Sequence, residues 1–274
     1  MLLKNSCLLL KQNLKFKIFK KFSRNMTNCK RLAAFDFDST ICNENSDIVV
    51  RNLLPSDVIA KYEICHKYDT TGWTQYMQGI FELLYANNID EALITKTLND
   101  IPPVDGMIEL IQKLKELNFD VIIISDANSF FIRTWLEKYD LLKCVKEIFT
   151  NPGEFRNGLL TIKMYHVQDT CQLSTINLCK GQILDDFIKS QRSNGVVYQQ
   201  VMFIGDGAND FCPMLRLNVG DSAFCRQGFQ CARIINMILQ GQPYKNQTYN
   251  FKADIFKWIN GFDILKIVTN SAKS

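Results

Sequence analysis

The 274-residue sequence has no long uninterrupted hydrophobic run, no CxxC pair, and no low-complexity tract or internal repeat. A spanning helix needs about 20 consecutive apolar residues, so no membrane span is predicted. Ten cysteines without a secretory signal predict reduced thiols, several of them buried. The composition, 47% hydrophobic and 22% charged, is close to the globular average and allows one large domain or two modest ones.

Acidic side chains are absent from residues 1–35, which carry nine Lys or Arg. Of the 32 basic residues, 23 therefore remain to face 28 acidic ones, so the body is mildly acidic and no nucleic-acid partner is predicted. Residues 1–31 are expected to be a basic leader, either disordered or targeting. They could be a mitochondrial presequence, an upstream extension with Met26 as the start, or a basic surface tail. The predicted location is cytoplasmic, or mitochondrial if the leader is a presequence.

Three apolar segments predict buried strands that end in polar residues: 32–37, 121–124, and the apolar part of "YQQVMFIGDGAND". Strands alternating with helices predict a Rossmann-like parallel α/β sheet. Helical patterns between the first two strands predict an inserted cap. The helices are expected near 55–68, 73–86, 89–99, 106–118, 129–139, 180–192, 209–217 and 226–239, with a strand near 145–149, a hairpin arm in "GLLTIKMYH" and a closing strand–helix pair. The predicted division is a catalytic core at 32–47 and 104–274 and a helical cap at 48–103.

Candidate site residues lie at or just past the predicted strand ends. Since ligands bind beyond the carboxyl ends of parallel strands, these groups should gather at one edge. Any single aspartate could instead cap a helix or form a turn. Several carboxylates in one crevice repel unless a cation neutralises them, and oxygen ligands suit Mg²⁺. The residues are Asp36, Asp38, Ser125, Asp126, Asp206 and Asp210.

The ordered set "DFDST", "ISDAN", Lys180 and "GDGAND" resembles the haloacid dehalogenase (HAD) superfamily of phosphotransferases. More narrowly, "FDFDSTICNENSD", "ISDANSFF", "NPGEF", "CKG" and "IGDGANDFCP" resemble the branch of phosphoethanolamine/phosphocholine phosphatases and pyridoxal phosphate phosphatases. The resemblance runs from about residue 32 almost to the C-terminus. It implies a HAD-like core and Mg²⁺-dependent hydrolysis of small phosphorylated metabolites.

The resemblance also implies roles for these residues. Asp36 would attack phosphorus and form an aspartyl-phosphate, and Asp38 would act as general acid and then general base. Asp36, the backbone carbonyl of Asp38, and Asp206 would hold Mg²⁺, with Asp210 orienting the metal shell. Ser125 and Lys180 would bind phosphoryl oxygens.

Asp47 and Asp126 match positions that contact substrate in the resembled phosphatases. Two carboxylates would suit a cationic leaving group such as ethanolamine or choline. The alternative is that each of them caps a helix. Aromatic side chains on the cap could contact choline or a pyridine ring, or pack the core of the cap, so they do not separate these substrates. They are Trp73, Tyr76, Phe81 and Tyr85.

One stretch, "YHVQDTCQLSTINLCKG", departs from the resembled proteins, which carry a His and a Cys-rich segment containing CxxC before the lysine. Here Ser174 takes the place of a cysteine and Thr175 the place of a proline, which argues against a structural metal. His166, Cys171 and Cys179 could still form a partial metal site. The alternative is a surface loop with two ordinary thiols.

Three other functions remain open at this point. The chain could be a non-catalytic phospho-ligand-binding protein on the same fold, although its site residues are all present. It could be a phosphatase for another small metabolite such as phosphoserine. An ATPase of the same superfamily is disfavoured, because ion pumps carry Thr at the position of Asp38.

Overall fold

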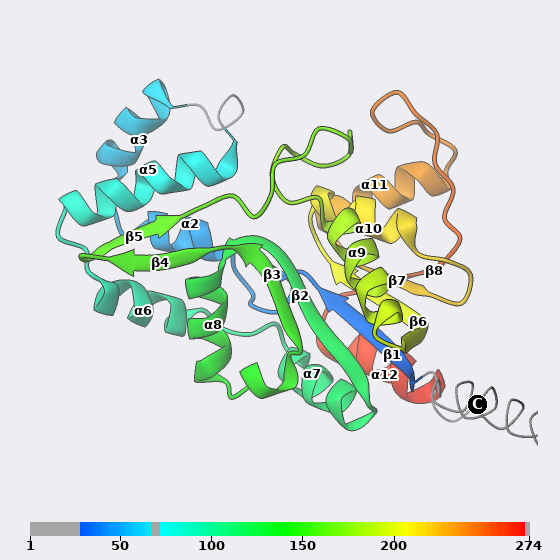
Figure 1. Cartoon of the computed structure of the whole chain (residues 1–274). Helices are drawn as coiled ribbons and strands as arrows, with labels where there is room; N and C mark the ends of the chain where they lie inside the picture. The colour runs from blue at the N-terminus through cyan, green and yellow to red at the C-terminus, as the bar shows by residue number, and fades with distance from the viewer. Residues whose placement is uncertain (1–27, 67–71, 272–274) are drawn as a thin grey trace, which may run out of the picture.

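The computed structural model describes residues 28–66 and 72–271, and its centre is a six-stranded parallel sheet (Figure 1). The strand order β3-β2-β1-β6-β7-β8 places β1 and β6 side by side in the middle. This arrangement confirms the predicted parallel α/β sheet. The strands are β1 (Asn28–Phe35), β2 (Phe119–Asn128), β3 (Glu147–Asn151), β6 (Val196–Gly205), β7 (Ser222–Arg226) and β8 (Asp254–Trp258).

Both faces of the sheet are covered, which explains its continuous apolar strands. Ala33 and Phe35 of β1 belong to one core and Leu32 and Ala34 to the other, because successive side chains of a strand point to opposite faces. The first core includes α7 (Met107–Glu116), α8 (Ser129–Lys138) and α12 (Gly261–Ser271). The second includes α9 (Lys180–Ser193), α10 (Phe211–Arg216) and α11 (Gln230–Leu239).

Among the described residues, four helices lie between β1 and α7: α2 (Ser46–Arg51), α3 (Ser56–Cys65), α5 (Trp73–Ala86) and α6 (Glu91–Asp100). The hairpin of β4 (Gly153–Arg156) and β5 (Leu159–Ile162) packs against α5 (Figure 1). The Ile162 amide donates to Gln78 Oε1 at 2.8 Å. A segment that follows β3 in the chain therefore packs with a helix that precedes β2.

Several element boundaries differ from the sequence-based expectations. β1 begins at Asn28, inside the segment predicted as a leader, and the rest of that leader lies outside the described residues. β7 was not predicted, because "SAFCR" is short and mixes small, polar and apolar residues. α11 consequently begins at Gln230 rather than near 226. The six-residue α2 was also missed in a polar stretch.

Two further observations concern the cysteines and the lengths of the helices. All nine described cysteines are unpaired, and six are buried, as the composition predicted. Among the helices of the described residues, none has the length and apolar character that crossing a membrane requires.

Candidate active site

Three carboxylates and one ammonium group meet at the carboxyl edge of the central strands. Carboxylate oxygens of Asp36, Asp206 and Asp210 all lie within 4.8 Å of one another. Lys180 Nζ lies 2.6 Å from Asp36 Oδ2 and 2.8 Å from Asp210 Oδ1. Asp36 is 4% exposed, and Lys180 and Asp210 are fully buried. Residues up to 174 positions apart in sequence thus meet in one crevice, between Asp36 and Asp210.

Local backbone geometry explains this convergence. The Asp36 amide donates to the Ile204 carbonyl at 2.9 Å and continues the pairing of β1 with β6 beyond Phe35. The Asp210 carboxylate accepts the amides of Asp206 and Gly207, both at 2.9 Å, so the turn after β6 closes around it. A Cβ on Gly205 would lie 2.3 Å from Asp210 Cγ, so only glycine permits this approach.

The electrostatics of the crevice show an excess of negative charge. Burial, with Asp36 adding, raises the pKa of Asp206 to about 7. The pKa of Asp210 is raised well above its usual range by burial and by Asp36. Burial alone would lower the pKa of Lys180, but Asp210 and Asp36 outweigh it and raise it. Since one ammonium faces three carboxylates, the donor set fits a hard divalent cation with oxygen ligands.

Asp38 lies on the loop after β1 and lines the same cavity as Asp36 and Asp206. Its Oδ1 accepts the Ser46 amide at 2.9 Å. Burial, with Asp47 adding, raises the pKa of Asp38 well above its usual range.

Thr40 contributes to the carboxylate crevice, although sequence analysis did not single it out. Its Oγ1 donates to Asp206 Oδ1 at 3.1 Å, and its side chain is fully buried. The signal was present in the sequence, because Thr40 closes the "DFDST" motif that carries Asp36 and Asp38.

The end of β2 supplies two further predicted residues. Ser125 is fully buried, and its Oγ accepts the Ala127 amide at 3.3 Å. Asp126 lines the cavity, and Asn209 Nδ2 donates to its Oδ2 at 3.3 Å. Burial raises the pKa of Asp126, although Lys180 opposes the shift. Asn209 was missed as a site residue, yet it stands inside the "GDGAND" motif.

Asp47 lies in the first turn of α2 and is 4% exposed. Trp73 Nε1 donates to its Oδ2 at 2.6 Å. Burial raises the pKa of Asp47 to about 7, with Asp126 adding to the shift. The capping alternative is wrong for both acids, because Asn45 caps α2 and Asn128 caps α8.

A cavity of about 410 Å³ opens above the carboxylates. The loop 173–175 and the pair Tyr244 and Lys245 form part of its wall. Among the described residues, the lining includes none of the four cap aromatics singled out in the sequence. Tyr76 and Phe81 are each 1% exposed and belong to the hydrophobic core instead.

Known phosphatases match this chain in sequence and in fold. Residues 31–271 match the family described as Putative Phosphatase. Pyridoxal phosphate phosphatase PHOSPHO2 of Mus musculus is 34% identical over 240 residues, covering 86% of this chain and 96% of the mouse protein. Human phosphoethanolamine/phosphocholine phosphatase is 31% identical over 236 residues, covering 85% and 86%. The solved phospho-aspartyl intermediate analogue of phosphoserine phosphatase shares the fold. Its TM-score is 0.54 at 23% identity, over 88% of this chain and 99% of that one.

Proposed function

We propose that this chain, which belongs to the putative phosphatase family of the HAD superfamily, uses Asp36 as a phosphoryl acceptor in hydrolysing small phosphomonoesters. The chain is a phosphomonoester hydrolase, and the proposal concerns its mechanism, metal and substrates. The observation that carries it is the meeting of Asp36, Asp206 and Asp210 with the buried ammonium of Lys180.

Mg²⁺ is the proposed cofactor. Asp36, Asp206 and the backbone carbonyl of Asp38 would hold it, and Asp210 would orient the ligands through the turn that it closes. When bound, Mg²⁺ supplies positive charge that neutralises phosphoryl oxygens. Thr40 would fix the Asp206 carboxylate through its hydrogen bond to Oδ1.

In the first chemical step, a carboxylate oxygen of Asp36 forms a bond to phosphorus while the ester P–O bond breaks. Asp38 gives its proton to the leaving alkoxide. In the second step, Asp38 takes a proton from water, whose oxygen attacks phosphorus and releases inorganic phosphate from Asp36. Lys180 stabilises the charge on the phosphoryl oxygens, with Ser125 as the further donor.

The preferred substrates are esters with a cationic leaving group, such as phosphoethanolamine and phosphocholine. Asp126 lines the cavity, and Asp47 is buried outside its lining but close enough for Asp126 to raise its pKa, so the two carboxylates would lie near the leaving group. Pyridoxal 5′-phosphate is the second candidate, because relatives that match this chain act on it. The proposed domain division assigns 48–103 to the cap, with the β4–β5 hairpin added, and 32–47 and 104–274 otherwise to the core.

Phosphate release from purified full-length protein tests this proposal. The panel is para-nitrophenyl phosphate, phosphoethanolamine, phosphocholine, pyridoxal 5′-phosphate and phosphoserine, each with Mg²⁺ and after chelation. We expect Mg²⁺-dependent release, with the amine esters turned over at the highest kcat/KM. Binding of a phosphate analogue without turnover of any ester would contradict the catalytic proposal. Turnover of phosphoserine alone would contradict the substrate assignment.

A further inference from the structure

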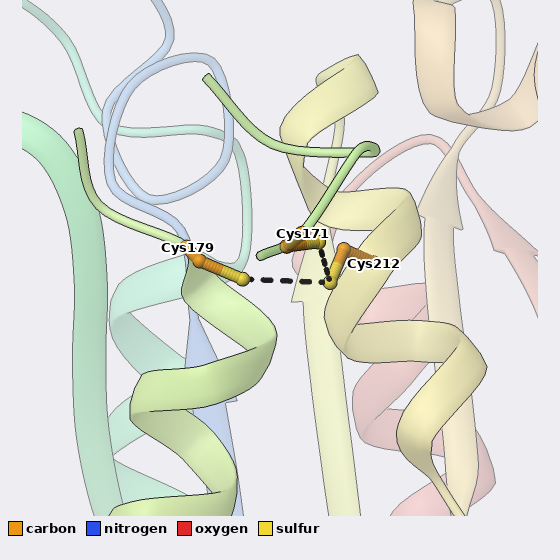
Figure 2. A group of neighbouring side chains, drawn as sticks. All are labelled: Cys171, Cys179 and Cys212. Carbon is orange, nitrogen blue, oxygen red and sulfur yellow. Dashed lines mark hydrogen bonds between the residues drawn. The ribbon is translucent and has the colours of Figure 1, made fainter. Parts of the chain in front are cut away.

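A second cluster of ligand atoms lies beside the carboxylate crevice and is made of sulfur (Figure 2). Cys171, Cys179 and Cys212 direct their Sγ atoms toward one another. The separations are 3.4 Å from Cys171 to Cys212 and 3.7 Å from Cys179 to Cys212, and all three sulfurs lie within 4.8 Å. These residues come from a loop, the N-terminal end of α9 and α10, so the cluster joins three separate segments.

The spacing of the sulfurs fits a metal ion better than a disulfide. A disulfide bond would hold two sulfurs about 2.0 Å apart and would leave the third thiol unused. Zn–S bonds of about 2.3 Å in a tetrahedral site hold sulfur atoms about 3.8 Å apart. The separations of Cys212 Sγ from Cys171 Sγ and from Cys179 Sγ are close to that value.

The surroundings of the cluster favour a thiolate at Cys179, whereas the pKa of Cys212 is raised by its hydrogen bond with Cys179 and by burial. Cys179 is the N-cap residue of α9, where the unpaired amides and the helix dipole stabilise negative charge. Arg216 Nη2 approaches Cys179 Sγ at 4.0 Å. The pKa of Cys179 is lowered to about 4, chiefly by its hydrogen bond with Cys212.

The close packing of α9 against α10 at the cluster depends on a glycine. Gly181 stands in the first turn of α9, directly opposite α10. A Cβ at this position would lie 2.6 Å from Cys212 Sγ and 2.5 Å from Arg216 Nε. The absence of a side chain at Gly181 therefore permits the close approach of the sulfur and the guanidinium.

We propose that Cys171, Cys179 and Cys212 bind one soft divalent cation of the Zn²⁺ class, separately from the proposed Mg²⁺ site. Three thiolates leave one coordination position for water or another small ligand. His166 is not part of this group of ligand atoms, and its Nε2 accepts the backbone amide of Cys179 at 3.1 Å. The ion would tie the loop containing Cys171 to α9 and α10.

The first test measures metal in the full chain, purified with a thiol-free reductant from zinc-supplemented cells. We expect one Zn²⁺ per chain by plasma mass spectrometry after gel filtration. Replacement by Co²⁺ should give a thiolate-to-cobalt charge-transfer band and the visible bands of a tetrahedral site. The Asp36→Asn variant should keep both signals, so the result is independent of whether the proposed catalytic function holds.

Variants assign the site to these sulfurs. Cys171→Ser, in the half-buried loop position, should weaken Zn²⁺ binding by at least about 100-fold in competition with a chromophoric chelator, beyond losses typical for residues that only orient a ligand. Cys144→Ser is the matched control, because Cys144 is buried in the core on the other face of the sheet. It should leave the affinity unchanged.

A gain of function guards against variants that fail to fold. Ser174 is in the loop that carries Cys171, where its amide donates to the Cys171 carbonyl at 3.3 Å, and its side chain contributes to lowering the pKa of Cys179. Ser174→Cys should therefore add a fourth thiolate and tighten Zn²⁺ binding at least about tenfold, with a stronger charge-transfer band.

Three results would overturn the proposal. The first is substoichiometric zinc in the wild-type chain that the Ser174→Cys change does not raise. The second is equal zinc affinity in wild type and Cys171→Ser. The third is a disulfide among the three cysteines, found by peptide mass spectrometry in protein purified without reductant and unchanged by added Zn²⁺.

Discussion

The carboxylate crevice and the thiol cluster share two chain segments but differ in chemistry. Lys180 and Asp210 face the crevice. Cys179 and Cys212, one and two residues away, face the sulfur cluster. The crevice offers hard oxygen donors around a buried ammonium, and the cluster offers soft sulfur donors near a guanidinium. The difference predicts two ions that do not exchange, with Mg²⁺ at one site and Zn²⁺ at the other.

Backbone geometry explains how neighbouring residues serve different sites. Cys179 has an extended conformation and Lys180 opens α9, so their side chains diverge at the helix start. Asp210 and Cys212 lie two positions apart at the beginning of α10, about 200° around a helix, so they point to opposite sides. Short motifs such as "CKG" and "GDGANDFCP" can therefore supply two sites at once.

Asp36→Asn should produce the largest difference between the two clusters. Loss of the nucleophile should lower kcat by at least about 10⁴-fold, while zinc content and the circular dichroism spectrum stay unchanged. Phosphate release and metal analysis on the same sample measure both effects. The matched control is Asp57→Asn, which replaces an exposed carboxylate of α3 and should keep full turnover. Comparable loss in both variants would contradict the assignment.

Asp38→Asn should have the next largest effect, because the amide can neither give nor take the proton. We expect kcat/KM, which reports the step that expels the leaving group, to fall about 10²–10⁴-fold for esters with poor leaving groups such as choline. The loss should be smaller for para-nitrophenyl phosphate, whose leaving group needs little protonation. An equal loss of kcat/KM for both esters would argue against the acid role.

Thr40→Val tests the crevice without changing its charge. The substitution keeps the side-chain shape but removes the hydrogen bond to Asp206 Oδ1. We expect the Mg²⁺ concentration for half-maximal activity to rise about 10- to 100-fold, with the Co²⁺–thiolate spectrum unchanged. A shifted thiolate spectrum would contradict the separation of the two sites. An unaltered Mg²⁺ requirement would contradict the proposal that Thr40 fixes the Asp206 carboxylate.

The smallest expected effect comes from the titration of Asp47, whose pKa is raised to about 7 by burial. Below that pH the carboxyl group is neutral, and above it the carboxylate attracts a cationic leaving group. The ratio of kcat/KM for phosphocholine to that for para-nitrophenyl phosphate should therefore rise up to about tenfold from about pH 6 to 8. Asp47→Asn should give a flat ratio. A ratio that rises equally in the variant would remove Asp47 from the substrate site.

Much of the fold and the carboxylate crevice could be predicted from the sequence. β1, β2 and β6 each contain a continuous apolar run that is buried on both faces. Asp36 and Asp206 of the crevice follow the runs of β1 and β6, and Asp126 of the cavity wall follows the run of β2. β7 could not be recognised, because "SAFCR" depends on its neighbours β6 and β8 for burial rather than on its own pattern. The packing of the β4–β5 hairpin on α5 depends on contacts between distant segments, which periodicity does not reveal.

The ligand set of the thiol cluster could not be predicted from the sequence. The predicted partial site contained His166, Cys171 and Cys179, because these residues stand in the stretch that matches the His and Cys-rich segment of the resembled proteins. The structure replaces His166 with Cys212, which is more than 30 positions from Cys179 and reaches the cluster through α10. Cys212 stood inside a motif already assigned to the carboxylates, so its side chain received no separate interpretation.

Trapping the covalent intermediate tests the central claim most directly. The full chain is mixed with Mg²⁺ and phosphoethanolamine, quenched in acid during turnover, and reduced with borohydride, which converts an acyl-phosphate to an alcohol. Peptide mass spectrometry should then find homoserine at position 36 and aspartate at positions 38, 206 and 210. Turnover without any modification of Asp36, or with the modification on another acid, would contradict the account.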